Sequence, residues 1–266
     1  MARNLMSDEE WAFFAPFVIE SGPKRGRPPK DHRLVLDGVF WIARTGSPWR
    51  DLPETFGPWA SVYRQFRRWT LAGIWDLILE ALNEAEGSLH SVQMIDSTVA
   101  RAHHCAAGER GGFRIRVLGA QEVASRPRSI SRRTARGCPS PSRSPAASEI
   151  TGGEVSDYRG YGPLMEADGP LARVLLADRG YDSDAIRQDM QDRGGVAVIP
   201  ARRNRKVRES VDTHIYALRN RIERCFNRLK NARRVATRYD KTAASFLGFV
   251  QITSIRMWFR DFVNTA

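Results

Sequence analysis

Residues 174–200 constrain the fold more than any other part of this chain. The short apolar run 174–177 ends at Asp178, and a second apolar run covers 196–200. The residues between them suit a helix that Gly194 can end. A strand, a helix and a strand in this order predict a right-handed crossover and a parallel strand pair. Active groups in such sheets lie at the carboxyl ends of strands, which is where Asp178 is expected.

The longest predicted helix covers residues 213–234. Its apolar residues recur at intervals of three and four, so they form one continuous stripe. Four other residues project from nearly one side of the same helix: Tyr216, Arg219, Glu223 and Lys230.

Three carboxylates on separate predicted elements could converge. Asp96 lies inside the predicted strand 92–99, Asp178 ends the next strand, and Glu223 lies on the long helix. Each residue alone is ordinary, because a carboxylate at a strand end often caps a helix and Glu223 can simply pair with Arg219. Together they suit two Mg²⁺ ions about 3.5–4 Å apart, since Mg²⁺ prefers hard oxygen ligands and such pairs serve phosphodiester chemistry.

Residues 1–90 predict a helical module. Ser7 and Glu10 have the spacing of a capping box, and further helices are expected over about 31–44, after Gly57, and over about 71–82. The predicted DNA contacts lie in a basic loop and on the third helix: Lys24, Arg25, Arg27, Arg64, Arg67 and Arg68. Short helices with sharp turns suit a helix-turn-helix DNA-binding domain. A small helical bundle with a solvated basic face explains the pattern equally well.

The overall charge favours a polyanionic partner. The 266 residues include 42 Lys and Arg against 30 Asp and Glu, which gives a net charge of +12. Nucleic acid is the favoured partner, and an anionic membrane surface is the alternative. No apolar run reaches the 18 residues of a spanning helix. Three scattered cysteines without a Cys-x-x-Cys pair, Cys105, Cys138 and Cys225, indicate neither a zinc site nor a disulfide framework. His103 and His104 are interpreted as solvated side chains.

The combination of motifs resembles the bacterial insertion-sequence transposases of the DDE class, in the group with a Tyr-Arg-Glu-Lys signature. The first carboxylate motif is Ile95-Asp96-Ser97-Thr98, and the second is Ala177-Asp178-Arg179-Gly180-Tyr181. The third is the set of four residues on the long helix, which matches at all four positions. The resemblance covers residues 5–110 and 149–262.

The resemblance implies an α/β architecture, in which a ribonuclease H-like catalytic domain over residues 91–266 follows the small helical domain in the sequence. It implies that Asp96, Asp178 and Glu223 hold catalytic Mg²⁺ (or Mn²⁺). It also implies that Tyr216, Arg219 and Lys230 contact DNA near the scissile phosphate or support Glu223. The implied partner is double-stranded DNA, both the terminal repeats of the element and its target. A homo-oligomer on DNA and a cytoplasmic, chromosome-associated location follow, with no membrane role.

Residues 113–148 depart from the family pattern. Their content of Arg, Pro and Ser predicts irregular or disordered chain, although a ribonuclease H-like fold needs a β-hairpin there. Synonymous codons for parts of this stretch, read one nucleotide earlier, can encode peptides that resemble the family strands. We therefore favour a hypothesis of two compensating frame shifts, which would damage the hairpin and could inactivate this copy. A natural basic insertion that binds DNA is the alternative.

Two further functions remain open from the sequence. One is a DNA-binding remnant of a transposase that no longer cleaves DNA. The other is a related nuclease that cuts DNA without joining it, since it would use the same three carboxylates.

Overall fold

The structure is a computed structural model of the chain. It describes residues 5–18, 31–85, 90–106, 114–124, 148–152, 161–166, 173–206 and 210–263. The predicted basic loop with Lys24, Arg25 and Arg27 lies outside the described residues.

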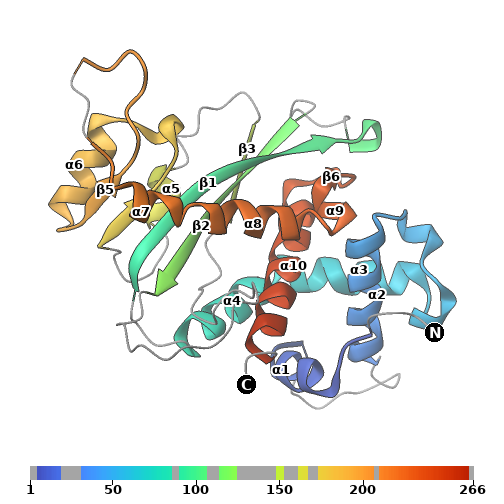
Figure 1. Cartoon of the computed structure of the whole chain (residues 1–266). Coiled ribbons are helices and arrows are strands. Elements are labelled where there is room, and N and C mark those ends of the chain that lie inside the picture. Colours follow the sequence, from blue (N-terminus) through green and yellow to red (C-terminus); the bar gives the residue numbers. More distant parts are fainter. Residues whose placement is uncertain are drawn as a thin grey trace.

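A mixed β-sheet forms the centre of the molecule (Figure 1). Its main path runs in the order β3-β2-β1-β4-β5, and β6 pairs with the far end of β1. β1 is parallel to β4, and β4 is parallel to β5, which confirms the parallel pair predicted from residues 174–200. The strands are β1 His90–Ala102, β2 Arg114–Ala124, β3 Ser148–Gly152, β4 Val174–Leu176, β5 Val196–Val198 and β6 Thr237–Arg238.

The prediction that residues 113–148 are irregular is wrong for Arg114–Ala124. These residues form β2, which pairs antiparallel with β1 and on its other side with β3. The strand that carries Asp96 therefore does not lack a neighbour on this side. Composition misled the prediction because the prolines begin only at Pro127, whereas Arg114–Ala124 contains no proline and includes β-compatible residues. The frame-shift hypothesis stays a prediction that the gene sequence tests, and residues 125–147 lie outside the described residues.

The expected N-terminal helices are confirmed, and local caps explain their ends. Ser7 and Glu10 exchange the two hydrogen bonds of a capping box, at 3.0 and 3.1 Å. Gly46 adopts a φ of +69° directly after the second helix, a conformation that costs glycine least. Gly73 has the same φ, and the fourth helix begins after it at Ile74, three residues later than predicted. The helices are α1 Asp8–Val18, α2 His32–Thr45, α3 Trp59–Leu71, α4 Ile74–Ala85, α5 Tyr161–Glu166, α6 Asp184–Asp192 and α10 Ala243–Val263.

The single long helix predicted over residues 213–234 is wrong in detail. The structure divides it into α7 Thr213–Ala217, α8 Asn220–Leu229 and α9 Arg233–Ala236. At the first division the backbone stays right-handed, but Leu218 and Arg219 donate to the residues three before them, at 3.1 and 3.0 Å. This is a tighter, 3₁₀-like turn inside a continuing helical path, so α7 and α8 lie nearly in line (Figure 1).

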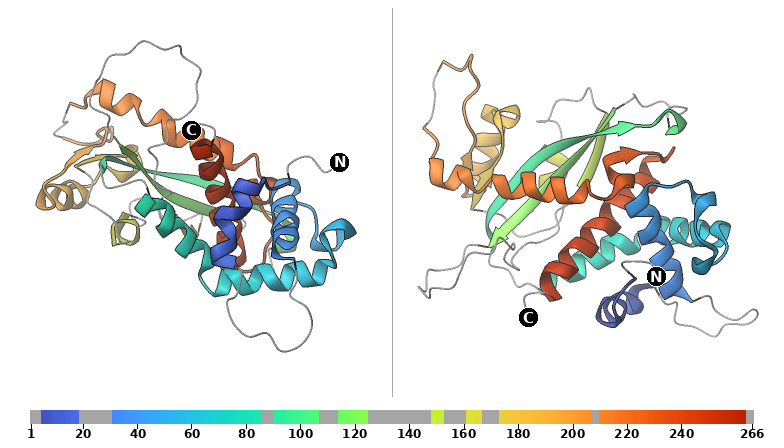
Figure 2. Two further views of the ribbon diagram at one scale, coloured as in Figure 1. Left: turned by 90° about the horizontal axis from the view of Figure 1, so that it is seen from below. Right: turned by 45° about the vertical axis from the view of Figure 1, so that its right-hand side comes forward.

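Side chains from both faces of the sheet are buried. On one face, Ile95, Leu175 and Ala177 pack with residues of α6. On the other face, Met94 and Leu176 join a larger cluster that includes α8, α10 and the N-terminal helices. In Figure 2, α8 runs along the strands, and α10 lies together with the N-terminal helices beside the sheet. Alternate residues of β1 therefore serve different layers, as expected for a strand covered on both faces.

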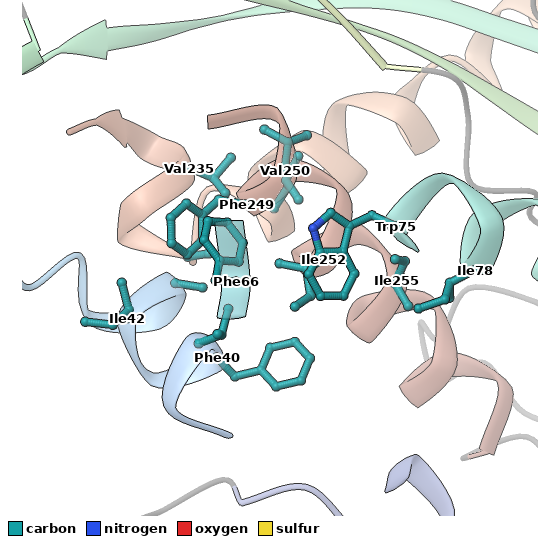
Figure 3. Packing of buried hydrophobic residues seen from close by; sticks show 14 of the residues in the cluster. Phe40, Ile42, Phe66, Trp75, Ile78, Val235, Phe249, Val250, Ile252 and Ile255 are labelled. Atoms are coloured by element: carbon teal, nitrogen blue, oxygen red, sulfur yellow. The ribbon is translucent and has the colours of Figure 1, made fainter. Parts of the chain in front are cut away.

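The N-terminal helices share this larger cluster with the C-terminal helix α10. Phe66 of α3 stacks on Phe249 of α10 with a centroid distance of 4.5 Å, and Trp75 lies beside them (Figure 3). Gly248 permits the close approach, because a Cβ there would lie 2.8 Å from the Thr70 hydroxyl. The boundary at residue 90 stays a prediction, and one buried cluster extends across it.

A buried arginine adds a polar link between the same two regions. Arg234 donates to both carboxylate oxygens of Asp240, at 3.0 and 2.8 Å, and to the carbonyl oxygen of Ser47 at 3.1 Å. Within the described part of the chain, none of the helices is long and apolar enough to cross a membrane.

Candidate functional site

Strand register brings the first two predicted carboxylates together. β1 and β4 run parallel with Met94 opposite Leu176, and Asp96 and Asp178 each lie two residues further along. Neighbouring strands are about 4.8 Å apart. Asp178 has extended backbone angles, so the alternation continues to it and both carboxylates belong to the face covered by α8. Asp178 thus lies directly beyond the carboxyl end of β4, as predicted.

Arg219 connects Asp96 with Glu223. Its guanidinium donates to Asp96 Oδ2 at 3.0 Å and to Glu223 Oε1 at 2.8 Å. Its Nε is buried without a hydrogen-bond partner among the described residues. Arg219 lies at the tight turn between α7 and α8, and this position lets one guanidinium reach both the sheet and the helix.

Charge and burial oppose each other at Asp96. The residue is 7% exposed, and burial raises the pKa of Asp96 above its ordinary value. Arg219 and the backbone N–H of Ser97 lower this pKa, whereas the negative charge of Asp178 raises it further. The balance is a raised pKa, because burial outweighs the stabilisation of the charge by Arg219 and Ser97.

The donor set fits divalent cations with hard oxygen ligands. Asp96 of β1 and Glu223 of α8 share the cation Arg219, and Asp178 at the end of β4 lies close enough to Asp96 to repel its charge. One guanidinium balances one of the three negative charges, so the described residues of this cluster keep a formal net charge of −2. A group of carboxylates arranged around a single positive group can hold Mg²⁺ or Mn²⁺ in the same place.

The other two signature residues lie on the same helical path, at different distances from the carboxylates. Tyr216 packs partly against the larger buried cluster and lies near Arg219. Burial alone would lower the pKa of Arg219, but Asp96 and then Tyr216 raise it above its ordinary value. Lys230 caps the C-terminal end of α8, two helical turns after Glu223, and pairs with none of the described residues.

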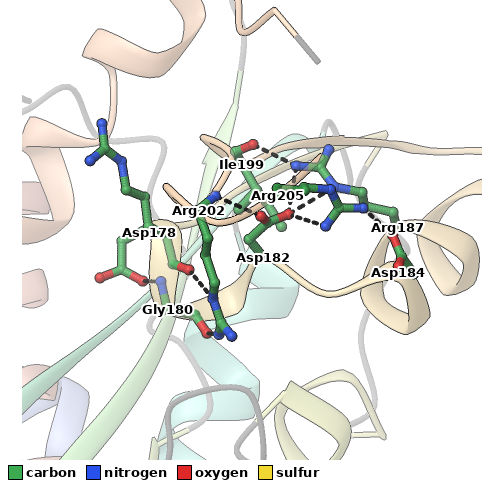
Figure 4. Close-up of polar contacts among 9 residues, drawn as sticks. Asp178, Gly180, Asp182, Asp184, Arg187, Ile199, Arg202 and Arg205 are labelled. Atoms are coloured by element: carbon green, nitrogen blue, oxygen red, sulfur yellow. Dashed lines mark hydrogen bonds and ion pairs between the residues drawn. The ribbon is translucent and has the colours of Figure 1, made fainter. Parts of the chain in front are cut away.

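A neighbouring polar cluster around Asp182 was not predicted from the sequence. Asp182 is buried and accepts hydrogen bonds from Arg187, Arg205 and the backbone N–H of Arg202 (Figure 4). Asp182 and Ser183 directly precede α6, and either residue type is a common helix cap. Ser183 occupies the cap position without a side-chain bond, and Asp182 does not cap the helix.

This Asp182 cluster holds the turn that carries Asp178. Arg202 donates to the carbonyl oxygens of Arg179 and Gly180, at 3.0 and 2.6 Å. Asp178 accepts the N–H of Gly180 at 2.8 Å in the same turn (Figure 4). The signal that could have found the cluster is an Asp four residues after Asp178, followed by an arginine-rich segment at 202–205.

The predicted DNA contacts that the structure describes lie on α3. Val62, Phe66 and Trp69 bury one side of this helix. Arg64 and Arg68 are exposed and Arg67 is half-buried, so they lie away from the buried side. This arrangement fits either a DNA-binding face or a solvated basic face, and their contact with DNA stays a prediction.

Comparison with known proteins assigns both parts of the chain. A family model described as "Putative transposase of IS4/5 family" matches residues 6–79, and one described as "Transposase DDE domain" matches residues 175–260. Asp178 and Glu223 lie inside the second match, and Asp96 lies between the two.

Several curated proteins are similar to the chain. An uncharacterized protein, y4sN, of Sinorhizobium fredii is 42% identical over 106 residues, which are 40% of this chain and 82% of that protein. The 16.2 kDa protein of insertion element IS402 of Burkholderia cepacia is 34% identical over 122 residues, 42% of this chain and 82% of that protein. The "Putative transposase for insertion sequence element IS6501" of Brucella ovis is 34% identical over 106 residues, 38% of this chain and 82% of that protein. No solved structure matches the chain.

The same family is thus indicated by the carboxylates on the mixed sheet, by the two family models and by the insertion-element relatives. The chain belongs to the bacterial insertion-sequence transposases of the IS4/5 family, with a DDE transposase domain.

Proposed function

We propose that this chain binds the ends of its insertion element and catalyses metal-dependent DNA strand cleavage and strand transfer. One observation carries the proposal: Asp96 and Glu223, which come from a strand and a helix far apart in sequence, bind the same guanidinium beside Asp178. Such a cluster suits metal-assisted displacement at a phosphodiester better than it suits a purely structural role.

Each residue then has a specific task. Asp96, Asp178 and Glu223 would hold Mg²⁺ or Mn²⁺, which when bound supplies activation of the attacking oxygen and stabilisation of the leaving oxygen. Arg219 would release the carboxylates and turn its planar fork to a DNA phosphate. Tyr216 would limit the positions open to Arg219, and Lys230 would offer a point charge to DNA further along the helix.

We further propose a ribonuclease H-like fold for the catalytic part. The β-hairpin expected after the Asp96 strand is supported by the antiparallel pairing of β2 with β1 and of β3 with β2. Helix α3, with Arg64, Arg67 and Arg68, is the proposed DNA-binding element of the helical module. We also propose that two copies of the protein assemble on the two ends of the element. This assembly would act on chromosomal DNA in the cytoplasm.

A cleavage assay tests this function directly. The full-length protein is incubated with labelled duplex DNA that carries the ends of the element, with Mg²⁺ or Mn²⁺. We expect nicking at the ends and joined products, both lost in Asp178→Asn. The exposed Asp192→Asn serves as a matched control and should retain activity.

Each possible result of this assay is informative. DNA binding without cleavage by the wild-type protein would contradict the catalytic proposal and favour a DNA-binding remnant. Cleavage without joined products would favour a nuclease. Cleavage that Asp178→Asn retains would remove Asp178 from the mechanism.

A further inference from the structure

The turn after β1 gathers three side chains with nitrogen and sulfur donors. His103, His104 and Cys105 follow one another there, and one ligand atom of each lies within 4.8 Å of the others. From the sequence the two histidines are predicted to be solvated, and the criterion for a zinc site is a Cys-x-x-Cys pair. A His-His-Cys run does not meet that criterion.

Both ends of this turn are anchored. The last residues of β1 pair with β6, and the N–H of His103 donates to the carbonyl oxygen of Arg238 at 2.8 Å. At the other end, the N–H of the buried Ala106 donates to the carbonyl oxygen of His103 at 2.8 Å. The backbone is therefore fixed, while His104 and Cys105 are exposed and His103 is half-buried.

The side chains are packed close enough for shared ligation. The His103 ring lies 4.0 Å from the His104 ring and 5.0 Å from the Tyr239 ring, between centroids. Cys105 donates its backbone N–H to His103 Nδ1 at 3.3 Å, a long bond that is easily replaced. In a tetrahedral zinc site the ligand atoms are roughly 3.3–3.8 Å apart, given metal–ligand distances of about 2.0–2.3 Å. Small rotations of the exposed side chains close that difference.

We propose that His103, His104 and Cys105 form a zinc site, with two imidazole nitrogens and one thiolate as ligands and water in the fourth position. Binding converts the Cys105 thiol to a thiolate and releases its proton to solvent. The soft donors select Zn²⁺ over Mg²⁺, whereas the carboxylate cluster has the opposite preference. The two sites are separate, because His103 lies seven residues beyond Asp96 on an extended strand, which spans about 23 Å.

Cobalt(II) spectroscopy tests this site independently of DNA cleavage. The full-length, reduced protein is titrated with Co²⁺ in excess Mg²⁺, which occupies the carboxylate sites without competing for a thiolate. We expect a thiolate-to-cobalt charge-transfer band and the visible bands of tetrahedral cobalt, saturating near one equivalent. Zn²⁺ should bleach both.

Variants decide which residues carry the signal. Cys105→Ser should lose the charge-transfer band, His104→Ala should lose the tetrahedral bands, and Cys225→Ser, which changes a half-buried cysteine on α8, should keep both. The Asp178→Asn variant should also keep both. Absence of the band in the wild-type protein, or its persistence in Cys105→Ser, would overturn the proposal. Circular dichroism of each variant shows whether it is folded, and loss of the signal in a folded Cys105→Ser supports the site.

Discussion

Two clusters of carboxylates and arginines lie next to each other. They differ in how far the arginines balance the negative charge of the carboxylates. In the first, Asp182 and Asp184 face Arg187 and Arg205, so the formal charges balance. In the second, Asp96 and Glu223 share the single guanidinium of Arg219, and Asp178 adds a negative charge beside Asp96. The clusters are joined by the short turn from Asp178 to Asp182.

The difference separates a structural carboxylate from an available one. The side chain of Asp182 is 1% exposed, and protein donors fill its oxygens, so a metal ion would gain little there. The side chain of Glu223 is 47% exposed, and its one ion-pair partner among the described residues, Arg219, is shared with Asp96. Both clusters stand beside β4, yet only the second keeps the excess negative charge that favours a divalent cation.

The largest effect on stability should come from Asp182→Asn. This change removes the buried charge that Arg187 and Arg205 share, although Arg205 keeps the exposed Asp184, and breaking such a pair when buried costs about 3–5 kcal/mol. Because Arg205 is partly exposed, we expect a loss of about 2–4 kcal/mol in the free energy of unfolding. Urea denaturation followed by circular dichroism measures it.

Asp184→Asn is the matched control for that measurement. It removes a carboxylate that also pairs with Arg205, but the Asp184 side chain is 91% exposed. We expect a change below about 1 kcal/mol. Equal losses in the two variants would contradict the view that burial and saturation distinguish Asp182.

The next effect concerns metal affinity and Arg219. If this guanidinium competes with the metal for Asp96 and Glu223, Arg219→Gln should tighten Mn²⁺ binding in the absence of DNA by about tenfold. Isothermal titration calorimetry or the electron paramagnetic resonance signal of free Mn²⁺ measures this. Arg224→Gln removes the same charge from an exposed position of α8 and should change the affinity less. Weaker binding in Arg219→Gln would mean that Arg219 supports the metal site instead.

A smaller effect on stability is expected for Asp178→Asn. Asp178 accepts one backbone N–H, from Gly180, and it adds repulsion to Asp96. The two contributions oppose each other, so we expect the free energy of unfolding to change by less than about 1 kcal/mol although cleavage is lost. A large destabilisation would show that Asp178 acts mainly as a cap of its turn.

The smallest effect is a pH dependence at Asp182. Burial alone would raise the pKa of Asp182, but the bonds from Arg202, Arg187 and Arg205 together lower it below 3.8. A lowered folded-state pKa stabilises the fold above the unfolded-state value and loses this contribution as the pH falls below it. The wild-type protein should therefore lose stability as the pH falls below about 4, and Asp182→Asn should lose less over the same fall in pH. Denaturant titrations at several pH values measure both slopes.

The sequence determined the local elements and the residue types that meet at the candidate site. The parallel pair at residues 174–200, the strand with Asp96 and the caps of the N-terminal helices follow from periodicity and from side chains only a few residues apart. The prediction for residues 113–148 failed at Arg114–Ala124, because an average over a mixed segment hid eleven residues that suit a strand.

Tertiary structure alone decided which groups meet. Arg219 and Asp96 are separated by 123 residues, and Asp182 reaches Arg202 and Arg205 across 20 and 23. Such contacts depend on strand register, on the tight turn between α7 and α8, and on a core that joins α10 to the N-terminal helices. Periodicity reports which face of one element is buried, and it carries no information about the partner that buries it. The chain therefore specifies three carboxylates and an arginine locally, and only packing makes them one site.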